Sequence, residues 1–187
     1  MPTLFPNFFK SVTTNISEYP IFIETGTQTG ATVFGLLDYF KHLHTIELSD
    51  HWHTKAKQFF EQRYSNKKDK LTLHLGDSKN VLNYLLPNIN EPVVFFLDAH
   101  YSGGDTARGD KDVPLLEELT AINNLLNEKA VIIIDDARLF GVKKGEDWTD
   151  ITFSTILKTI QNRLEKFYYL PSELSEQDRF VIHLNKK

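Results

Sequence analysis

Cysteine is absent from the 187-residue sequence, and methionine occurs only once. The absence of cysteine excludes a disulfide framework, a cysteine-ligated zinc site and a thiol nucleophile, and it suits a reducing compartment. No segment approaches the roughly 18 consecutive apolar residues that a membrane-spanning helix needs. The opening residues, MPTLFPNFFKSV, lack a basic segment followed by a long apolar one. We therefore expect a cytoplasmic protein that does not enter a membrane.

An excess of positive charge is also missing. The 21 Lys and Arg residues against 25 Asp and Glu residues give a formal net charge of -4. Such a chain has no general attraction for phosphate backbones or anionic lipid. The short lysine clusters are better interpreted as solvated loops or tail, at 66–70, 142–144 and 185–187. We expect neither a nucleic-acid partner nor a membrane partner.

The composition is that of a folded globular domain, with 41% apolar and 25% charged residues. A chain of this length buries one core well, whereas a second core would be cramped. We expect a single domain over residues 1–187, in which residues 1–20 form an N-terminal cap segment. Through its aromatic residues this segment would cover an active site, contact a second subunit of a homodimer or extend the core: Phe5, Phe8, Phe9 and Tyr19.

Short apolar runs alternate along the chain with segments whose apolar residues recur at helical spacing. The runs are continuous and rich in β-branched or aromatic residues, which predicts strands covered on both faces at 21–24, 42–48, 71–75, 93–98 and 131–135. Helices are predicted at 29–40, 50–64, 77–86, 113–128 and 150–166. Two final strands, 167–170 and 173–184, have no helix between them. This order predicts a Rossmann-like, doubly wound α/β sheet, mostly parallel, of about seven strands with an antiparallel C-terminal edge hairpin.

The first predicted strand leads into a turn rich in threonine and glycine, residues 24–30. Gly26 and Gly30 allow a sharp turn and a close approach of the backbone to a ligand, and the next helix offers free N–H groups. The two glycines are four residues apart with Gln28 between them, which departs from the G-x-G-x-x-G spacing of dinucleotide sites. Glu24, the acid that ends the strand, suits a ligand with a cationic group. A turn that serves only strand-to-helix packing is the alternative.

The next two predicted strands also end in acids. A carboxylate at Glu47 could bind both hydroxyls of a ribose. Asp77 could accept from an exocyclic amine and Ser78 could bond a ring nitrogen, although Asp77 is equally a candidate N-cap of the next helix. Because Glu24, Glu47 and Asp77 end successive parallel strands, together they predict one ligand with an amine, a ribose and an adenine-like ring.

At these residues, and from FIETGTQTG to the final hairpin, the chain resembles the class I S-adenosylmethionine-dependent methyltransferases. Many members have a glycine where Gln28 stands. The resemblance implies that S-adenosylmethionine is the cofactor, with its methionine part at the first loop, its ribose at Glu47 and its adenine at Asp77. The cofactor contacts that it implies are Glu24, Thr25, Gly26, Thr27, Gln28, Gly30, Glu47, Leu48, Asp77, Ser78 and Asp98.

Three further carboxylates follow the fourth and fifth predicted strands, which are neighbours in the predicted sheet: Asp98, Asp135 and Asp136. Crowded carboxylates raise one another's pKa unless a cation neutralises them, and hard divalent ions accept oxygen ligands. The arrangement is similar to that of the metal-dependent O-methyltransferases of the catechol and macrolide-sugar types. That similarity implies a divalent ion, magnesium or manganese, held by these three residues.

A bound ion would orient two adjacent hydroxyls of an acceptor and lower the pKa of one of them. A base must still remove the proton of an alkyl hydroxyl, and Asp98 and His100 are the two candidates. The glycine-rich loop 98–114 offers Tyr101 for stacking and Arg108 for an anionic or hydroxyl-rich group. A second substrate wall is predicted in residues 138–150, through Arg138, Lys143 and Trp148.

The sequence thus predicts an S-adenosylmethionine-dependent O-methyltransferase that uses a divalent metal and a sugar or another vicinal diol as acceptor. The alternative is a non-catalytic cofactor- or metal-binding module of the same fold. A nucleotide triphosphatase, which also holds magnesium at acidic strand ends, is disfavoured because the chain has no G-x-x-x-x-G-K-[ST] loop.

Overall fold

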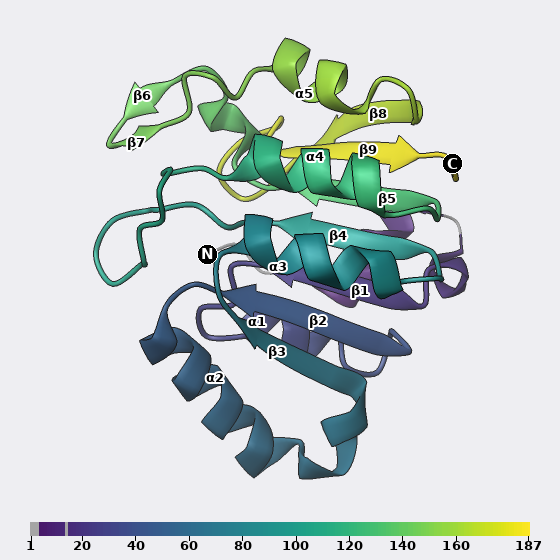
Figure 1. Cartoon of the computed structure of the whole chain (residues 1–187), viewed down its shortest axis with the longest axis vertical. Coiled ribbons are helices and arrows are strands. Elements are labelled where there is room, and N and C mark those ends of the chain that lie inside the picture. Colours follow the sequence, from purple (N-terminus) through teal and green to yellow (C-terminus); the bar gives the residue numbers. More distant parts are fainter. Residues whose placement is uncertain (1–3, 14) are drawn as a thin grey trace.

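A seven-stranded sheet forms the centre of the computed structural model, which describes residues 4–13 and 15–187 (Figure 1). The strand order is β3-β2-β1-β4-β5-β9-β8, and β9 runs antiparallel to both of its neighbours while the first five strands are parallel. This topology confirms the predicted fold class. The strands are β1 (Ile21–Thr25), β2 (His42–Glu47), β3 (Leu71–Leu75), β4 (Val93–Leu97), β5 (Ala130–Ile134), β8 (Leu164–Leu170) and β9 (Arg179–Leu184).

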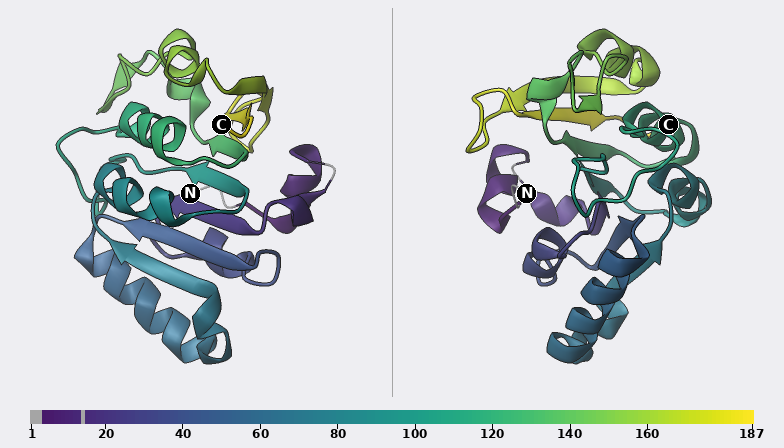
Figure 2. Two further views of the ribbon diagram at one scale, coloured as in Figure 1. Left: turned by 45° about the vertical axis from the view of Figure 1, so that its right-hand side comes forward. Right: turned by 90° about the vertical axis from the view of Figure 1, so that its left-hand side faces the viewer.

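Helices cover both faces of this sheet (Figures 1 and 2). One face carries α3 (Ser78–Leu85), α4 (Leu115–Leu125) and α5 (Phe153–Ile160), and the other carries α1 (Ala31–Gly35) and α2 (Asp50–Arg63). A small hairpin of β6 (Lys143–Lys144) and β7 (Glu146–Asp147) stands apart from the main sheet. The single-turn or short 3-10 helices are Pro6–Ser11, Ile16–Glu18, Ser65–Lys70, Leu86–Asn88 and Ala137–Leu139. No helix among the described residues has both the length and the apolar character to cross a membrane.

Each central strand is buried on both sides, as its unbroken apolar sequence predicts. In β4, Val93 and Phe95 point into the core beneath α3 and α4, while Val94 and Phe96 point into the core on the opposite face. All four side chains are at most 1% exposed. The two cores fix the register of the sheet, because a slip of one residue would exchange the faces.

The N-terminal segment packs on the face that carries α1 and α2 (Figure 2). Leu4, Phe9 and Val12 are buried in that core, and the Phe9 ring meets the Phe40 ring edge-on with centroids 5.5 Å apart. Phe5, in contrast, is exposed. Residues 1–3 and 14 of the predicted cap segment lie outside the described residues. The described part of the segment therefore extends the hydrophobic core.

Helix α5 is shorter than predicted, since it ends at Ile160 and the next strand begins at Leu164. The cause is Arg163, whose buried guanidinium donates to main-chain carbonyl oxygens of Leu126, at 2.9 Å, and Glu128, at 2.6 Å, just past the end of α4. Carbonyls at the end of a helix are free to accept and carry partial negative charge. Because this contact is tertiary, the helical spacing of 161–166 gave no sign of the break.

Candidate active site

A pocket opens at the carboxyl ends of β1 to β4, on the left-hand edge of the sheet in Figure 1. Its outer wall is the segment 98–114, here called the strap, which crosses this edge between β4 and α4. The predicted site residues that line the pocket are Gly26, Gln28, Glu47, Leu48, Asp77, Ser78, Asp98, His100 and Tyr101. The predicted residues that do not line it are Glu24, Thr25, Thr27, Gly30, Arg108, Asp135, Asp136 and Arg138.

The loop after β1 passes tightly over the end of β4. Gly26 has a φ of +86°, and a Cβ atom on it would lie 2.6 Å from the carbonyl oxygen of Asp98. The backbone of Gln28 is also in the left-handed region, with a φ of 44°. Gln28 thus takes a conformation that favours glycine, at the position where many members of the family that the chain resembles have glycine. The loop therefore owes its close fit to Gly26 and brings its backbone to the floor of the pocket.

Glu47 ties the first two loops together at the end of β2. Its carboxylate accepts from the backbone N–H of Gln28 at 2.7 Å and from that of Ser49 at 2.8 Å. A carboxylate has about four acceptor positions. Glu47 therefore retains acceptor capacity for the hydroxyls of a ligand in the pocket that it lines.

Glu24 lies behind the loop and is 2% exposed. It accepts from the hydroxyl of Thr45 at 2.8 Å, and this hydroxyl is 2.6 Å from that of Thr27. Burial raises the pKa of Glu24 to about 8, although the hydrogen bond from Thr45 opposes the rise. Glu24 thus supports the loop from below, and its contact with an amino group of a ligand stays a prediction.

Asp77 is both the N-cap of α3 and a residue of the pocket lining, so its predicted contact with an adenine stays a prediction. Its side chain caps α3 by accepting from the Lys79 backbone N–H at 3.2 Å, and it also lines the pocket. Gly109 of the strap comes so close that a Cβ on it would lie 3.5 Å from a carboxylate oxygen of Asp77. The strap therefore closes over the part of the pocket that was predicted to hold an adenine.

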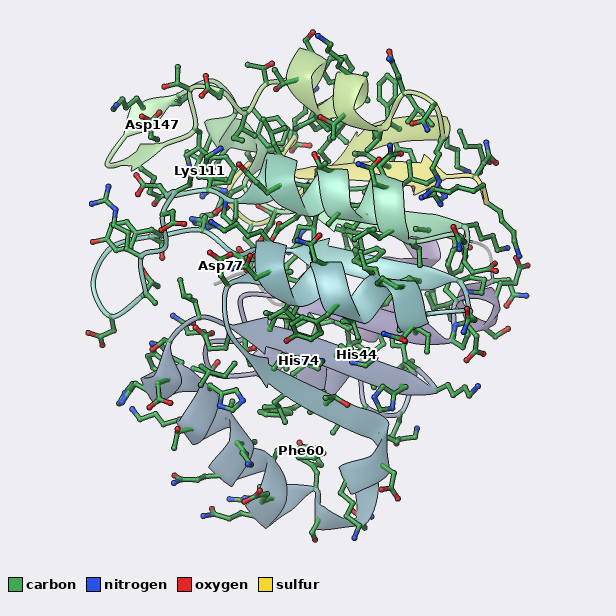
Figure 3. The ribbon with its side chains drawn as sticks, viewed as in Figure 1. His44, Phe60, His74, Asp77, Lys111 and Asp147 are labelled. Carbon is green, nitrogen blue, oxygen red and sulfur yellow. The ribbon has the colours of Figure 1, made fainter. Side chains whose placement is uncertain are left out.

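Side chains from the helices at this edge fasten the strap, and sequence reasoning missed them. Trp52 of α2 donates its indole N–H to the carbonyl of Asp105 at 3.1 Å, and Lys79 of α3 binds Asp110 at 2.9 Å. Lys111 pairs with a glutamate of α4, and Figure 3 shows Asp77 and Lys111 at the same edge. Their positions in the sequence could have indicated this role, because Trp52 and Lys79 each lie in the first turn of a helix that directly follows a strand.

His100 is the centre of an acidic cluster at the ends of β4 and β5. Its Nε2 lies 2.9 Å from Oδ2 of Asp136 and 3.5 Å from Oδ1 of Asp98, and its Nδ1 lies 3.1 Å from Oε2 of Glu146. Burial opposes a charge on this imidazole, but the hydrogen bonds and the charges of Asp136 and Asp98 raise its pKa to about 10. The negative potential that retains this proton would equally attract a divalent cation.

Asp135 is the least satisfied carboxylate of this cluster. Its side chain is fully buried, and neither carboxylate oxygen has a hydrogen-bond partner among residues 4–13 and 15–187. Arg179 approaches only to 3.5 Å. Burial together with the charges of Asp98 and Asp136 raises the pKa of Asp135 to about 7. A buried carboxylate without a hydrogen bond is costly, and the ion pair with Arg179 compensates it only in part, so a further cation at this site would be favourable.

The structure divides the three predicted metal ligands between two overlapping sets, so Asp98 and Asp135 do not share one. The described side chains that could hold a metal ion are Asp98, His100 and Asp136 in one set, and Asp135, Asp136 and Asp178 in the other. Asp136 belongs to both sets and has a left-handed φ of 59°, which is uncommon for a residue other than glycine. His100, predicted as a base, therefore also stands in a ligand position.

The predicted substrate residues divide into two groups. Tyr101 lines the pocket and the exposed guanidinium of Arg108 lies over its ring at 5.2 Å. Arg138 is engaged with Asp136 and with Asp178, the latter at 2.6 Å. In the described part of the chain, the pocket lining contains no residue of the predicted wall at 138–150. Trp148 is buried with its ring 5.2 Å from that of His100, and Lys143 pairs with Asp147.

Glu118, in the first turn of α4, is a buried acid that was missed. It is 1% exposed, and its carboxyl group lies against the hydroxyls of Ser78 and Thr25. Burial raises the pKa of Glu118 to about 7, although those hydroxyls work in the opposite direction. It lies beside Ser78, which lines the pocket, and no pattern in the sequence separated it from a solvated helix acid.

Comparison with known proteins shows the fold alone. No protein-family profile and no curated protein matches the chain. Among solved structures, the O-methyltransferase TomG of Streptomyces achromogenes, involved in tomaymycin synthesis and bound to S-adenosylmethionine, superposes with a TM-score of 0.63 at 15% identity. That match covers 91% of this chain and 74% of TomG.

Two other neighbours widen the range of functions on this fold. SMU.1697c of Streptococcus mutans, solved with S-adenosylhomocysteine, has a TM-score of 0.60 at 17% identity and covers 97% of this chain and 94% of its own. An rRNA methylase of Streptococcus thermophilus has a TM-score of 0.55 at 16% identity, over 90% of this chain and 87% of its own. The chain therefore has the Rossmann-like α/β fold of the S-adenosylmethionine-dependent methyltransferases.

Gly26→Ala should destabilise the protein, because the added methyl group meets the Asp98 carbonyl in a left-handed position. Gly141→Ala is the matched control, since Gly141 has a φ of +76° and open space around it. The control should lose about 1 kcal/mol from the backbone conformation alone, and Gly26→Ala about 1 to 3 kcal/mol more from the clash. Urea unfolding measures both, and equal losses would show that the loop does not need the close approach.

Glu118→Gln should stabilise the protein at pH 8 relative to wild type but not at pH 4. The folded-state pKa of about 7 lies above the ordinary value of 4.5, so the wild type loses stability as the pH rises through this window. The expected difference between variant and wild type at pH 8 is roughly 1 to 3 kcal/mol. Urea unfolding at both pH values measures it, with the exposed Glu165→Gln as control, and a difference independent of pH would contradict the assignment.

Proposed function

We propose that the protein is an S-adenosylmethionine-dependent O-methyltransferase that uses a divalent metal, magnesium or manganese, to position and activate a hydroxyl of a sugar or another vicinal diol. The observation that carries the proposal is the buried carboxylate of Asp135, which has no hydrogen-bond partner among the described residues and meets Arg179 only at 3.5 Å, behind a pocket at the carboxyl ends of the parallel strands. The acceptor side of the proposal comes from the resemblance to metal-dependent O-methyltransferases.

The pocket has the groups that the cofactor needs. Glu47, at its wall, offers carboxylate oxygens to the ribose hydroxyls, while Asp77 and Ser78 offer an acceptor and a hydroxyl to the adenine. Gln28 and Gly26 bring the first loop to the pocket, where the methionine part would lie. Two neighbours of the same fold are solved with S-adenosylmethionine or S-adenosylhomocysteine, which supports this choice of ligand.

The acidic centre fits a divalent cation. Asp98, Asp135 and Asp136 would hold it through oxygen ligands drawn from the two sets that share Asp136, and Asp135 would gain a closer partner than Arg179 at 3.5 Å. A metal bound there supplies Lewis acidity, which lowers the pKa of an acceptor hydroxyl. A metal in this site would thus supply the positive charge that stabilises the acceptor hydroxyl in its deprotonated form.

Residues of the chain itself have to exclude water from the site and accept the proton of the acceptor hydroxyl. The strap, fastened by Trp52 and Lys79, closes one side of the pocket, and the buried Trp148 packs beside His100. Asp98, whose pKa burial raises, and His100 are the two groups placed to accept the hydroxyl proton. His100 holds its own proton while it lies between the carboxylates, so Asp98 is the better candidate in the arrangement seen here.

An RNA acceptor is the second candidate function, because one neighbour is an rRNA methylase and another structure is a fibrillarin/Nop5p complex. The charge of the pocket lining disfavours it. Two lysines, Lys79 and Lys111, are outnumbered there by the acids Glu47, Asp77, Asp98, Asp112 and Glu117. A phosphate backbone is repelled by such a lining, whereas a neutral diol is not.

The proposal predicts that Asp135→Ala abolishes methyl transfer while S-adenosylhomocysteine still binds, because Asp135 lies outside the pocket lining. The assay incubates protein, cofactor and Mg²⁺ or Mn²⁺ with a panel of sugars, catechols and a short RNA, and detects the methylated product by mass spectrometry. Asp38→Ala, which removes an exposed acid, should keep full activity.

Product formation that survives both Asp135→Ala and a chelator would remove the metal from the mechanism. Methylation of the RNA alone would replace the diol acceptor by a nucleic acid. The absence of product from every acceptor, despite cofactor binding, would support the non-catalytic module instead.

A further inference from the structure

We propose that the metal centre takes the imidazole of His100 as a ligand, together with Asp98 and Asp136, and that it therefore selects a transition metal such as Mn²⁺ over Mg²⁺. This inference rests on the proposed function, because it specifies the ligands and the metal class of the same centre. It differs from the oxygen-only set of Asp98, Asp135 and Asp136 that the resemblance implies.

The distances around His100 have the scale of a coordination shell. Its Nε2 lies 2.9 Å from an oxygen of Asp136 and 3.5 Å from an oxygen of Asp98, and one ligand atom from each residue falls within 4.8 Å of the others. Adjacent ligands of an octahedral ion with bonds of 2.0 to 2.2 Å are about 3 Å apart. A small movement of the three side chains would therefore admit an ion between atoms that already converge.

The other ring nitrogen of His100 is directed by a second layer of polar groups. Its Nδ1 lies 3.1 Å from Oε2 of Glu146 in β7, an ion-pair distance at which no hydrogen bond is formed, and the indole N–H of Trp148 donates to the same oxygen at 2.8 Å. Histidine ligands of metals commonly have a carboxylate at the nitrogen that does not bind the ion, which fixes the ring and raises its basicity. Glu146 thus stands where its carboxylate would orient the ring electrostatically, as a positioning residue, while Nε2 faces the two aspartates.

Asp135 supplies an independent sign that a cation belongs here. It is fully buried, its oxygens have no hydrogen-bond partner among the described residues, and its charge is coupled most strongly to that of Asp98. The ion would neutralise this carboxylate as well as its direct ligands.

The ligand set decides which ion is preferred. Mg²⁺ favours oxygen ligands and binds imidazole poorly, whereas Mn²⁺ and the later divalent metals accept a nitrogen ligand along with carboxylates. An Asp-His-Asp centre should therefore bind Mn²⁺ at least tenfold more tightly than Mg²⁺. Replacement of His100 by an oxygen donor should reduce that preference.

A second group of histidines must be controlled for, because it too can attract transition metals. His44 of β2 and His74 of β3 have ring nitrogens 3.1 Å apart, and Figure 3 shows both side chains over the neighbouring strands. The variant His74→Gln removes this pair without touching the acidic centre. It is the background in which metal binding should be measured.

The experiment is pulsed electron paramagnetic resonance of Mn²⁺ bound to the full chain, in wild type, His74→Gln and His100→Asn. Nitrogen modulation of the spin echo should be present in wild type and in His74→Gln, and lost in His100→Asn. Calorimetric competition should show the tenfold preference for Mn²⁺ over Mg²⁺ in the first two proteins and a smaller one in the third. In case His100→Asn does not fold, Glu146→Gln retains the ligand and should weaken Mn²⁺ binding about 10- to 100-fold.

The outcomes separate this inference from the function on which it rests. Mn²⁺ that binds without nitrogen modulation, or with no preference over Mg²⁺, would overturn the histidine ligand while leaving a metal-dependent methyltransferase intact. Nitrogen modulation that disappears in His74→Gln would place the ion at the histidine pair and overturn the inference. No binding of Mn²⁺ to wild type, with or without S-adenosylhomocysteine, would remove the metal from the proposed function too.

Discussion

Mutual repulsion of buried carboxylates is the constraint on which the organisation of this edge of the sheet depends. Parallel strands bring their carboxyl ends together, so Glu24, Asp98 and Asp135 lie close to one another in a region from which water is excluded. The polar and basic groups around these carboxylates reduce the repulsion. Thr45 donates to Glu24, His100 stands between Asp98 and Asp136, and Arg179 approaches Asp135 to 3.5 Å without a hydrogen bond. This incompletely compensated carboxylate is the feature from which the proposed metal site is argued.

Much of the fold was predictable because the local signals agree with the global structure. Continuous β-branched and aromatic runs such as VVFFL identify strands buried on both faces, and β4 occupies almost the predicted residues. The ends of the elements were less predictable, since tertiary contacts decide them. Helix α5 stops where the guanidinium of Arg163 reaches the carbonyls beyond α4, a contact between residues far apart in the sequence.

The residues that line the pocket were predictable from the order of the strands, whereas the residues that contact them from neighbouring loops and helices were not. Glu47 and Asp77 were found because they end strands, and the topology carries every strand end to one edge. The placement of Glu146 beside His100, and the fastening of the strap by Trp52, depend on loop geometry that leaves no periodic trace in the sequence. Loops at such an edge are positioned by their contacts, so single residues in them carry function without a recognisable pattern.

The central claim is that this pocket holds the cofactor of the fold, and calorimetric titration of the protein with S-adenosylhomocysteine tests it most directly. The account predicts binding at micromolar concentration, weakened by Glu47→Gln because the ribose hydroxyls lose a charged acceptor. The exposed Glu61→Gln should leave the affinity unchanged. Absence of binding, with and without Mn²⁺, would contradict the account and leave the glycine turn as a packing feature of the sheet.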